Sequence, residues 1–461
     1  MHHHIYVISD LHLGGAPAAD DKPGFQICPP STQKILADFI LRLPKSSDSH
    51  DCHLIIAGDI VDFLAEEPFK SFTTDPVEAL HKFNGIVENT APVWAAIRRF
   101  VVEHSGNLVL MLGNHDIELS LPMTRDALVD RVGRGRVRFI DDNQAFVLGP
   151  VLIEHGNRFD AWNAVPHNAL RRMRSQLSRR LSATPPFPAL PGSRLVAETM
   201  NPLKKDYPFI DLLKPEGAAA LPILAALGAG GIKDVWTFYR NFRRQNEVDY
   251  DENQEPLDPE LIAAPSSTEE ALYRLAMDIA AGGDASKISA AGDVLAGALE
   301  FVDEKKRQLR RSALFEAFRR TMDIHRQAFD VSREDSTYLK PARRSSAAGF
   351  KVVVYGHTHL VKCIPIGADG QSVYLNSGTW ADLMRVPDEA WAADAAAARG
   401  ALEDFVDDLE QSNLGRWRRS CGTYARIELE DETVLTANVH FGDDDQIVTT
   451  EGLLSRLKQG A

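Results

Sequence analysis

Residue types that bind divalent metal ions recur along the chain at short spacings, each time just after an apolar run. The set combines carboxylates, imidazoles and one amide, which suits manganese, iron, zinc or nickel better than calcium, whose protein ligands are oxygens. The residues are Asp10 and His12 in SDLHLGG, Asp59 in GDIVD, Asn114 in GNHD, His155 in EHG, and His357 with His359 in GHTH. The sequence therefore predicts a metal site built from distant segments.

The elements that must position these residues are short apolar runs rich in β-branched side chains. Such runs of four to eight residues favour strands that are covered on both faces. Helical periodicity over residues 32–43 and 76–104 separates the first three runs, so strand and helix alternate, and the residues just past each strand should gather at one edge of an α/β sheet. The predicted strands cover residues 5–9, 54–57, 108–112, 151–154 and 351–355.

The order of the motifs, DxH, GDxxD, GNHD, a lone histidine before glycine and then GHxH, resembles that of the calcineurin-like metallophosphoesterases. The resemblance covers residues 5–160 and 350–380. It implies two packed β-sheets flanked by helices, a four-layer αββα core. It also implies two divalent ions, with manganese the first choice, that share Asp59 as a bridge, because a carboxylate can bind both and neutralise part of their charge. The implied ligands are Asp10, His12, Asp59 and His359 for one ion, and Asp59, Asn114, His155 and His357 for the other.

This resemblance implies hydrolysis of a phosphoester by a hydroxide that bridges the two metals. His115 is the expected general acid for the leaving oxygen, and Asp116 is expected to fix the tautomer of His115 by accepting its other N–H. The alternative role for His115 is a simple contact to phosphate. We expect Asp62 to cap the helix after its strand, and Asn376 to support the site through its side-chain amide.

The chain has 461 residues, too many for one ordinary domain. We expect residues 1–160 to form the first half of the core and residues 346–385 the second half. Between them, residues 161–345 should form a helical insertion that caps the site and selects the substrate, with helices near 267–281 and 286–329. Residues 386–461 should complete the core with a helix over 389–411 and a hairpin over 423–441.

Composition narrows the classes of protein. The formal net charge of −14, from 51 basic and 65 acidic side chains, argues against a global nucleic-acid surface, so the expected partner is a phosphorylated substrate of unknown identity. The four cysteines form no CxxC pair, and no apolar run is long enough to span a bilayer, which favours a cytoplasmic protein without a transmembrane segment. His2, His3 and His4, either natural or a tag remnant, are expected to form a solvated terminus with no metal role.

The substrate stays open between monoester, diester and pyrophosphate. The insertion is similar in position to the cap of the UDP-diacylglucosamine pyrophosphohydrolases, which act on a lipid-linked pyrophosphate, although those enzymes carry Arg in place of His115 and a shorter cap. Phosphoprotein phosphatases follow the second motif with Arg-Gly, which this chain lacks. A different class, a metal-free protein-interaction scaffold on the same fold, is the second alternative.

Overall fold

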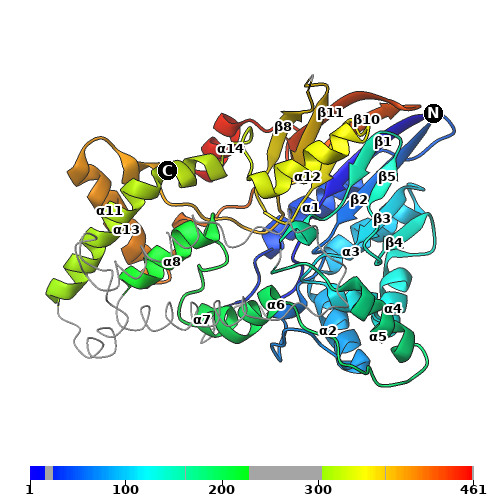
Figure 1. The fold of residues 1–461 in the computed structure, drawn as a ribbon, viewed down its shortest axis with the longest axis horizontal. Helices are drawn as coiled ribbons and strands as arrows, with labels where there is room; N and C mark the ends of the chain where they lie inside the picture. Colours follow the sequence, from blue (N-terminus) through cyan, green and yellow to red (C-terminus); the bar gives the residue numbers. More distant parts are fainter. Residues whose placement is uncertain (16–23, 161, 228–303, 369, 459–461) are drawn as a thin grey trace.

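The computed structural model describes residues 1–15, 24–160, 162–227, 304–368 and 370–458. It is a mixed α/β structure with two multi-stranded sheets flanked by helices (Figure 1). This confirms the predicted α/β class with two sheets. All five predicted strands are present, and the predicted helix over residues 76–104 is divided into two by a break at Thr90.

The first sheet has six strands, with β1 to β4 parallel and the C-terminal hairpin added antiparallel beside β1. In β1, Tyr6 and Ile8 face the flanking helices, whereas Ile5 and Val7 face the second sheet. Both faces are therefore apolar, which explains the continuous apolar runs in the sequence. The order is β11 (Thr433–Phe441), β10 (Thr423–Glu430), β1 (His2–Ile8), β2 (His50–Ala57), β3 (Asn107–Met111) and β4 (Val137–Ile140).

The second sheet has five strands and packs against the first through a shared apolar layer that includes Val109, Ile153 and Val354. Its β6, β7 and β9 are parallel, so their carboxyl ends lie at one edge. The order is β5 (Phe146–Leu148), β6 (Val151–Ile153), β7 (Val352–Tyr355), β9 (Ser372–Asn376) and β8 (Lys362–Ile366).

Helices cover the outer faces of the two sheets. One apolar cluster joins the first sheet to helices α1 to α5, and another joins the second sheet to α12. Asp75 caps α2 and Asp335 caps α12, each by accepting a backbone N–H. The helices are α1 (Pro30–Arg42), α2 (Pro76–Asn89), α3 (Ala91–Val102), α4 (Pro122–Val132), α5 (His167–Leu177), α6 (Pro191–Leu195), α7 (Asn201–Lys204), α8 (Glu216–Ala226), α11 (Glu304–Ala328), α12 (Ser336–Ala347), α13 (Ala395–Glu410) and α14 (Thr450–Leu457).

The hydrophobic clusters divide the chain differently from the predicted ranges 161–345 and 386–461. Helix α13, expected to complete the core, instead packs with α8 and α11 in a separate cluster that we call the helical lobe (Figure 1). Conversely, α5 and α12 belong to the insertion by sequence but pack on the two sheets. The predicted ranges differ from these clusters because apolar helix surfaces can pack against each other however far apart they are in the sequence. The predicted hairpin does complete the first sheet, and the predicted helix near 267–281 lies outside the described residues.

The N-terminal histidines are not a solvated tail. His2, His3 and His4 form the start of β1, paired on one side with β10 and on the other with β2, and all three are partly buried. The expectation of a solvated terminus is therefore wrong, because the strand ladder extends to residue 2. No helix within the described residues is long and apolar enough to cross a membrane.

Candidate metal centre

The loops that follow five strands bring all seven predicted ligands together. β1 leads to Asp10 and His12, β2 to Asp59, β3 to Asn114, β6 to His155, and β7 to the two histidines of GHTH. Among the described residues, three groups at these loops place ligand atoms within 4.8 Å of one another. They are Asp10 with His12 and His359, Asp59 with His155 and His357, and His12 with Asp62 and His115.

In the first group, Asp10 and His12 are buried and His359 is partly buried. Nε2 of His12 lies 3.0 Å from Nε2 of His359, which in turn lies 3.4 Å from Oδ1 of Asp10. The other oxygen of Asp10 accepts the backbone N–H of His357 at 2.9 Å and the hydroxyl of Ser9. Burial, followed by the charge of Lys214, lowers the pKa of His359 to about 4, so its imidazole is neutral and able to bind a metal at pH 7.

The second group contains Asp59, whose Oδ2 lies 3.2 Å from Nε2 of His155 and 3.9 Å from Nε2 of His12. One carboxylate oxygen therefore lies between the two groups, in the position of a shared ligand. Its Oδ1 accepts the backbone N–H of His115 at 2.8 Å. Nδ1 of His155 lies 2.7 Å from the carbonyl of Ala57 and donates its proton there, which orients Nε2 toward Asp59 as the atom that could bind a metal. Burial opposes ionisation of Asp59, but His155 and His115 hold the pKa of its carboxyl well below its usual range.

Asn114 and His357 are oriented by residues that the sequence did not single out. The side-chain N–H of Asn114 donates to Asn163 at 3.4 Å, so Oδ1 is the atom of this amide that could bind a metal. Nε2 of His357 lies 3.1 Å from Asp160, which also accepts from Asn163 at 2.7 Å. Asp160 and Asn163 follow no motif spacing, so only proximity in the fold identifies them.

Three buried ligand atoms lack a hydrogen-bond partner within the part of the chain that the structure describes. They are Oδ1 of Asp10, Oδ1 of Asn114 and Nε2 of His155. A buried polar atom left without a partner costs about 1–3 kcal/mol, so three such atoms in adjacent groups need an explanation. Cations bound at these groups would supply it. The residues present thus fit two divalent ions, one in each group.

The backbone at the ligand positions is strained. Asp10, His12, Asp59, His357 and His359 all have φ between 43° and 70°, a region that residues other than glycine rarely adopt. Such strain clusters at functional sites because the surrounding structure must hold it. Two glycines make room for the ligands. A Cβ on Gly113 would lie 2.1 Å from Oδ1 of Asp59, and a Cβ on Gly58 would lie 2.5 Å from the ring of His155.

Asp62 takes the part that was predicted for Asp116. Its Oδ1 lies 3.2 Å from Nδ1 of His115, and its Oδ2 lies 3.4 Å from Nδ1 of His12. Asp116 instead accepts the backbone N–H groups of Gly113 and Ile60, both at 2.7 Å. The prediction that Asp116 orients His115 is therefore wrong, because its carboxylate turns back to fix the loop. The predicted cap is confirmed, since Asp62 also accepts the N–H groups of Leu64 and Ala65.

The charge around His115 favours its protonated form. Burial opposes protonation, but the carboxylates of Asp62 and Asp59 raise the pKa of His115 to about 9. Its side chain is 21% exposed, against 1% for His12 and 2% for His155. His115 is thus the imidazole of the cluster that meets solvent most.

Asn376 supports the GHTH loop, as predicted. Its side-chain N–H groups donate to the carbonyl of Gly356 at 2.9 Å and the hydroxyl of Thr358 at 3.0 Å. Its oxygen accepts the N–H of Gly378 at 2.9 Å. All of its polar atoms are used in this support, so Asn376 holds the loop that carries His357 and His359.

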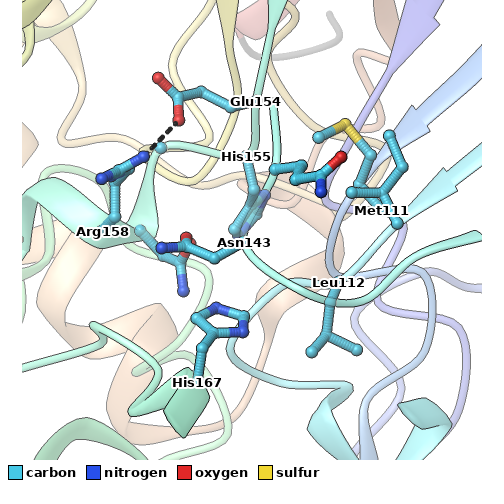
Figure 2. Close-up of a pocket in the computed structure, with 11 residues that line it drawn as sticks. Met111, Leu112, Asn143, Glu154, His155, Arg158 and His167 are labelled. Carbon is cyan, nitrogen blue, oxygen red and sulfur yellow. Dashed lines mark hydrogen bonds and ion pairs between the residues drawn. The ribbon is translucent and has the colours of Figure 1, made fainter. Parts of the chain in front are cut away.

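A small polar cavity of about 30 Å³ lies beside His155 (Figure 2). Its lining includes Asn143, His167 and the Glu154–Arg158 ion pair, whose atoms lie 3.5 Å apart. This volume holds a water molecule but no substrate. We therefore place no substrate in this cavity.

Comparisons with protein-family models, with curated proteins and with solved structures gave no match to this chain, so the reading of the site rests on its own residues and geometry.

Proposed function

We propose that this chain is a metal-dependent phosphoesterase with the four-layer αββα core of the calcineurin-like metallophosphoesterases. The observation that carries the proposal is that six of the seven predicted ligands, from four strand ends, form two groups with Asp59 between them. Among the described residues, three ligand atoms, including Oδ1 of Asn114, have no hydrogen-bond partner. Chance pairing of buried polar residues does not account for this, since buried polar atoms normally satisfy one another.

The groups would hold one ion on Asp10, His12, Asp59 and His359, and a second on Asp59, Asn114, His155 and His357. When bound, such ions supply Lewis-acid polarisation of a phosphoryl oxygen and make water more acidic. Manganese is the first choice for both, with iron, zinc or nickel as alternatives, because the donor set mixes imidazole with oxygen ligands.

The protein's own contribution to chemistry is proton donation and positioning. Asp62 fixes the ring of His115, whose partly exposed imidazole can donate a proton to the leaving oxygen. Asp160 and Asn163 hold His357 and Asn114 in place, which fixes the geometry of the second group.

Two lysines of the segment after α6, one of them ion-paired with Asp211, lie near the centre. Lys204 and Lys214 are both buried, and their charges oppose protonation of His115 and His359 respectively, so both lysines lie close enough to influence the centre. Asn201 ties this segment to the core by donating to the carbonyl of Leu64 at 2.7 Å. We propose that this segment and the helical lobe form the cap that selects the phosphorylated substrate.

The test is hydrolysis by metal-stripped protein that is reconstituted with Mn²⁺. The substrate panel contains p-nitrophenyl phosphate, bis-p-nitrophenyl phosphate, nucleotides, a UDP-sugar and a phosphopeptide, which separates monoester, diester and pyrophosphate cleavage. No turnover of any member with Mn²⁺, Fe²⁺, Zn²⁺ or Ni²⁺ would overturn the proposal. Less than one bound metal per chain after reconstitution would instead favour a metal-free scaffold.

Asp59→Asn is the decisive variant, because it removes charge from the shared position with little change of shape. We expect kcat/KM to fall by more than tenfold, a loss above about 1.4 kcal/mol of transition-state stabilisation, together with a loss of bound metal. Asp38→Asn, the same substitution at an exposed position on α1, should change neither quantity. Retention of more than about a tenth of kcat/KM by Asp59→Asn would show that the shared position is wrong.

A further inference from the structure

A second group of metal-binding side chains lies at the opposite end of β1 from Asp10. In the strand ladder, His4 is opposite Glu428 of β10, and His2 is opposite Glu430. Because side chains alternate along a strand, His2, His4 and Glu428 share one face of the sheet. Ligand atoms of these three residues all lie within 4.8 Å of one another. Figure 1 shows β1 and β10 side by side near the N-terminus.

Both imidazoles converge on one carboxylate oxygen. Oε2 of Glu428 lies 2.8 Å from Nε2 of His2 and 2.7 Å from Nδ1 of His4. The second contact lacks hydrogen-bond geometry, and Nδ1 of His4 has no hydrogen-bond partner elsewhere among the described residues. A buried ring nitrogen lies this close to a carboxylate oxygen without a hydrogen bond between them. A cation bound to both atoms would explain this contact.

The carboxylate is fixed from the other side. Arg426 donates from Nε at 3.0 Å and from Nη2 at 2.8 Å to Oε1 of Glu428, which leaves Oε2 for the histidines. This arrangement matches the outer hydrogen bonds that orient carboxylate ligands in metal sites. The side chains of His2, His4 and Glu428 are 28%, 22% and 12% exposed, so an ion bound here would keep one side open to water.

The opposite face of the same strand provides a contrast. There, His3 lies near Asp51 and His53, but Nδ1 of His3 hydrogen-bonds Nε2 of His53 at 3.1 Å. Asp51 is bound by Arg136 at 2.7 Å. The contact between the two rings is satisfied without an ion, so this second cluster gives no comparable reason to expect one.

We propose that His2 Nε2, His4 Nδ1 and Glu428 Oε2 bind one divalent transition-metal ion of the zinc class, separate from the dinuclear centre. Two imidazoles and one carboxylate with an open position are a donor set that zinc accepts. The ion would connect β1, the strand that leads to Asp10, with β10 of the C-terminal hairpin. This site does not depend on the proposed phosphoesterase activity.

The test compares two matched carboxylates on one strand, in protein purified without any added histidine tag. Glu428→Gln removes the charge of the proposed ligand, whereas Glu430→Gln makes the same change at an exposed position two residues away. Metal-stripped proteins are titrated with Zn²⁺ against a chelator, and bound zinc is counted by mass spectrometry. We expect Glu428→Gln to bind one zinc fewer per chain than wild type, or to bind that zinc at least about tenfold more weakly, and Glu430→Gln to match wild type.

His4→Asn serves as the second variant and should show the same loss, with circular dichroism confirming that each metal-free variant is folded. Zn²⁺ should raise the thermal midpoint of wild type. The rise should be smaller in Glu428→Gln, because this variant lacks the stabilisation from zinc bound at the His2–His4–Glu428 site. Equal zinc stoichiometry and affinity in wild type and Glu428→Gln would overturn the proposal, because chelation by a run of histidines alone does not need Glu428. Failure of the dinuclear centre is recognised separately, by Asp59→Asn.

Discussion

His115 combines three properties that together suit an acid. Its Nδ1 is tied to Asp62, its backbone N–H is held by Asp59, and its ring is the most exposed of the imidazoles in the cluster. The two carboxylates favour the imidazolium form, which is the form that can donate. If His115 only contacted phosphate, its positive charge would be needed, but the fixed orientation of its ring would not.

His115→Asn should therefore lower kcat by about 10²–10⁴ on a substrate with a poor leaving group. The loss should be smaller on p-nitrophenyl phosphate, since p-nitrophenolate leaves without needing a proton. The measurement is kcat for an alkyl and an aryl phosphoester with the same variant. Equal losses on both would contradict the acid role and favour a phosphate contact.

The buried carboxyl of Glu118 provides a test of folding stability that does not depend on catalysis. Its side chain is buried and accepts the N–H of Thr73 at 2.7 Å. Burial raises the pKa of Glu118 from 4.5 to about 7. Below pH 4.5 both folded and unfolded chains hold the proton. As pH rises to 7 the unfolded chain releases its proton first, so stability falls through this window by on the order of 3 kcal/mol.

Glu118→Gln should remove this part of the pH dependence while keeping the acceptor for Thr73. The measurement is the free energy of unfolding in urea at pH 5 and pH 8. The drop between these two pH values should be smaller in the variant than in wild type. Glu103→Gln, at a carboxylate whose side chain is 58% exposed, should behave as wild type. An unchanged drop in Glu118→Gln would show that the buried carboxyl does not titrate in this window.

The junctions between strands and loops set the geometry of the candidate metal centre. Gly113 follows β3 and lies against Asp59, which follows β2. Because a Cβ on Gly113 would lie 2.4 Å from the backbone N of Asp59 as well as against its side chain, the loop after β2 would have to move. A displacement of about 1 Å in a catalytic group can cost about 10²-fold in rate.

Gly113→Ala should accordingly lower kcat/KM by about 10²-fold and weaken metal binding. Gly85→Ala is the matched control, because Gly85 lies inside α2 with no atom within 4 Å of the added Cβ among the described residues. That control should keep full activity and gain about 0.5–1 kcal/mol of stability. Full activity in Gly113→Ala would mean that the two loops are less tightly packed than the structure places them.

These junctions also explain which parts of the candidate site could be predicted from the sequence. That the candidate ligands lie close together was predictable, because metal chemistry restricts residue type and turns after apolar runs restrict spacing, while their assignment to two ions came from the family resemblance. Asp62, Asp160 and Asn163 were not assigned their roles, since an outer hydrogen-bond partner needs only to be polar and near. β4, β5 and β8 were not predicted. β4 and β5 are only four and three residues long, and Pro365 interrupts β8 at the sheet edge.

For the whole molecule, the main departure from expectation is the helical lobe. Helix α13 lies far from α8 and α11 in sequence, yet Trp391, which precedes it, donates from its indole N–H to the carbonyl of Phe318 at 2.9 Å. Arg311 of α11 also pairs with Asp407 of α13. The sequence predicted a mostly helical insertion and a helix over residues 389–411, but not that these two segments pack together. The lobe has its own apolar cluster, distinct from those of the two sheets.

Phe318→Ala tests whether this lobe is separable from the chemistry. Phe318 is fully buried in the lobe, so truncation should cost about 3–5 kcal/mol of stability. Where the variant remains folded, its kcat/KM for a small aryl phosphoester should stay near that of wild type, because the strand ends hold the candidate ligands. Its selectivity among larger phosphorylated substrates should fall. Leu435→Ala, at a position 49% exposed on β11, should change stability by less than about 0.5 kcal/mol and leave selectivity intact. Loss of activity on the small substrate in folded Phe318→Ala would show that the lobe is needed to hold the metal centre itself.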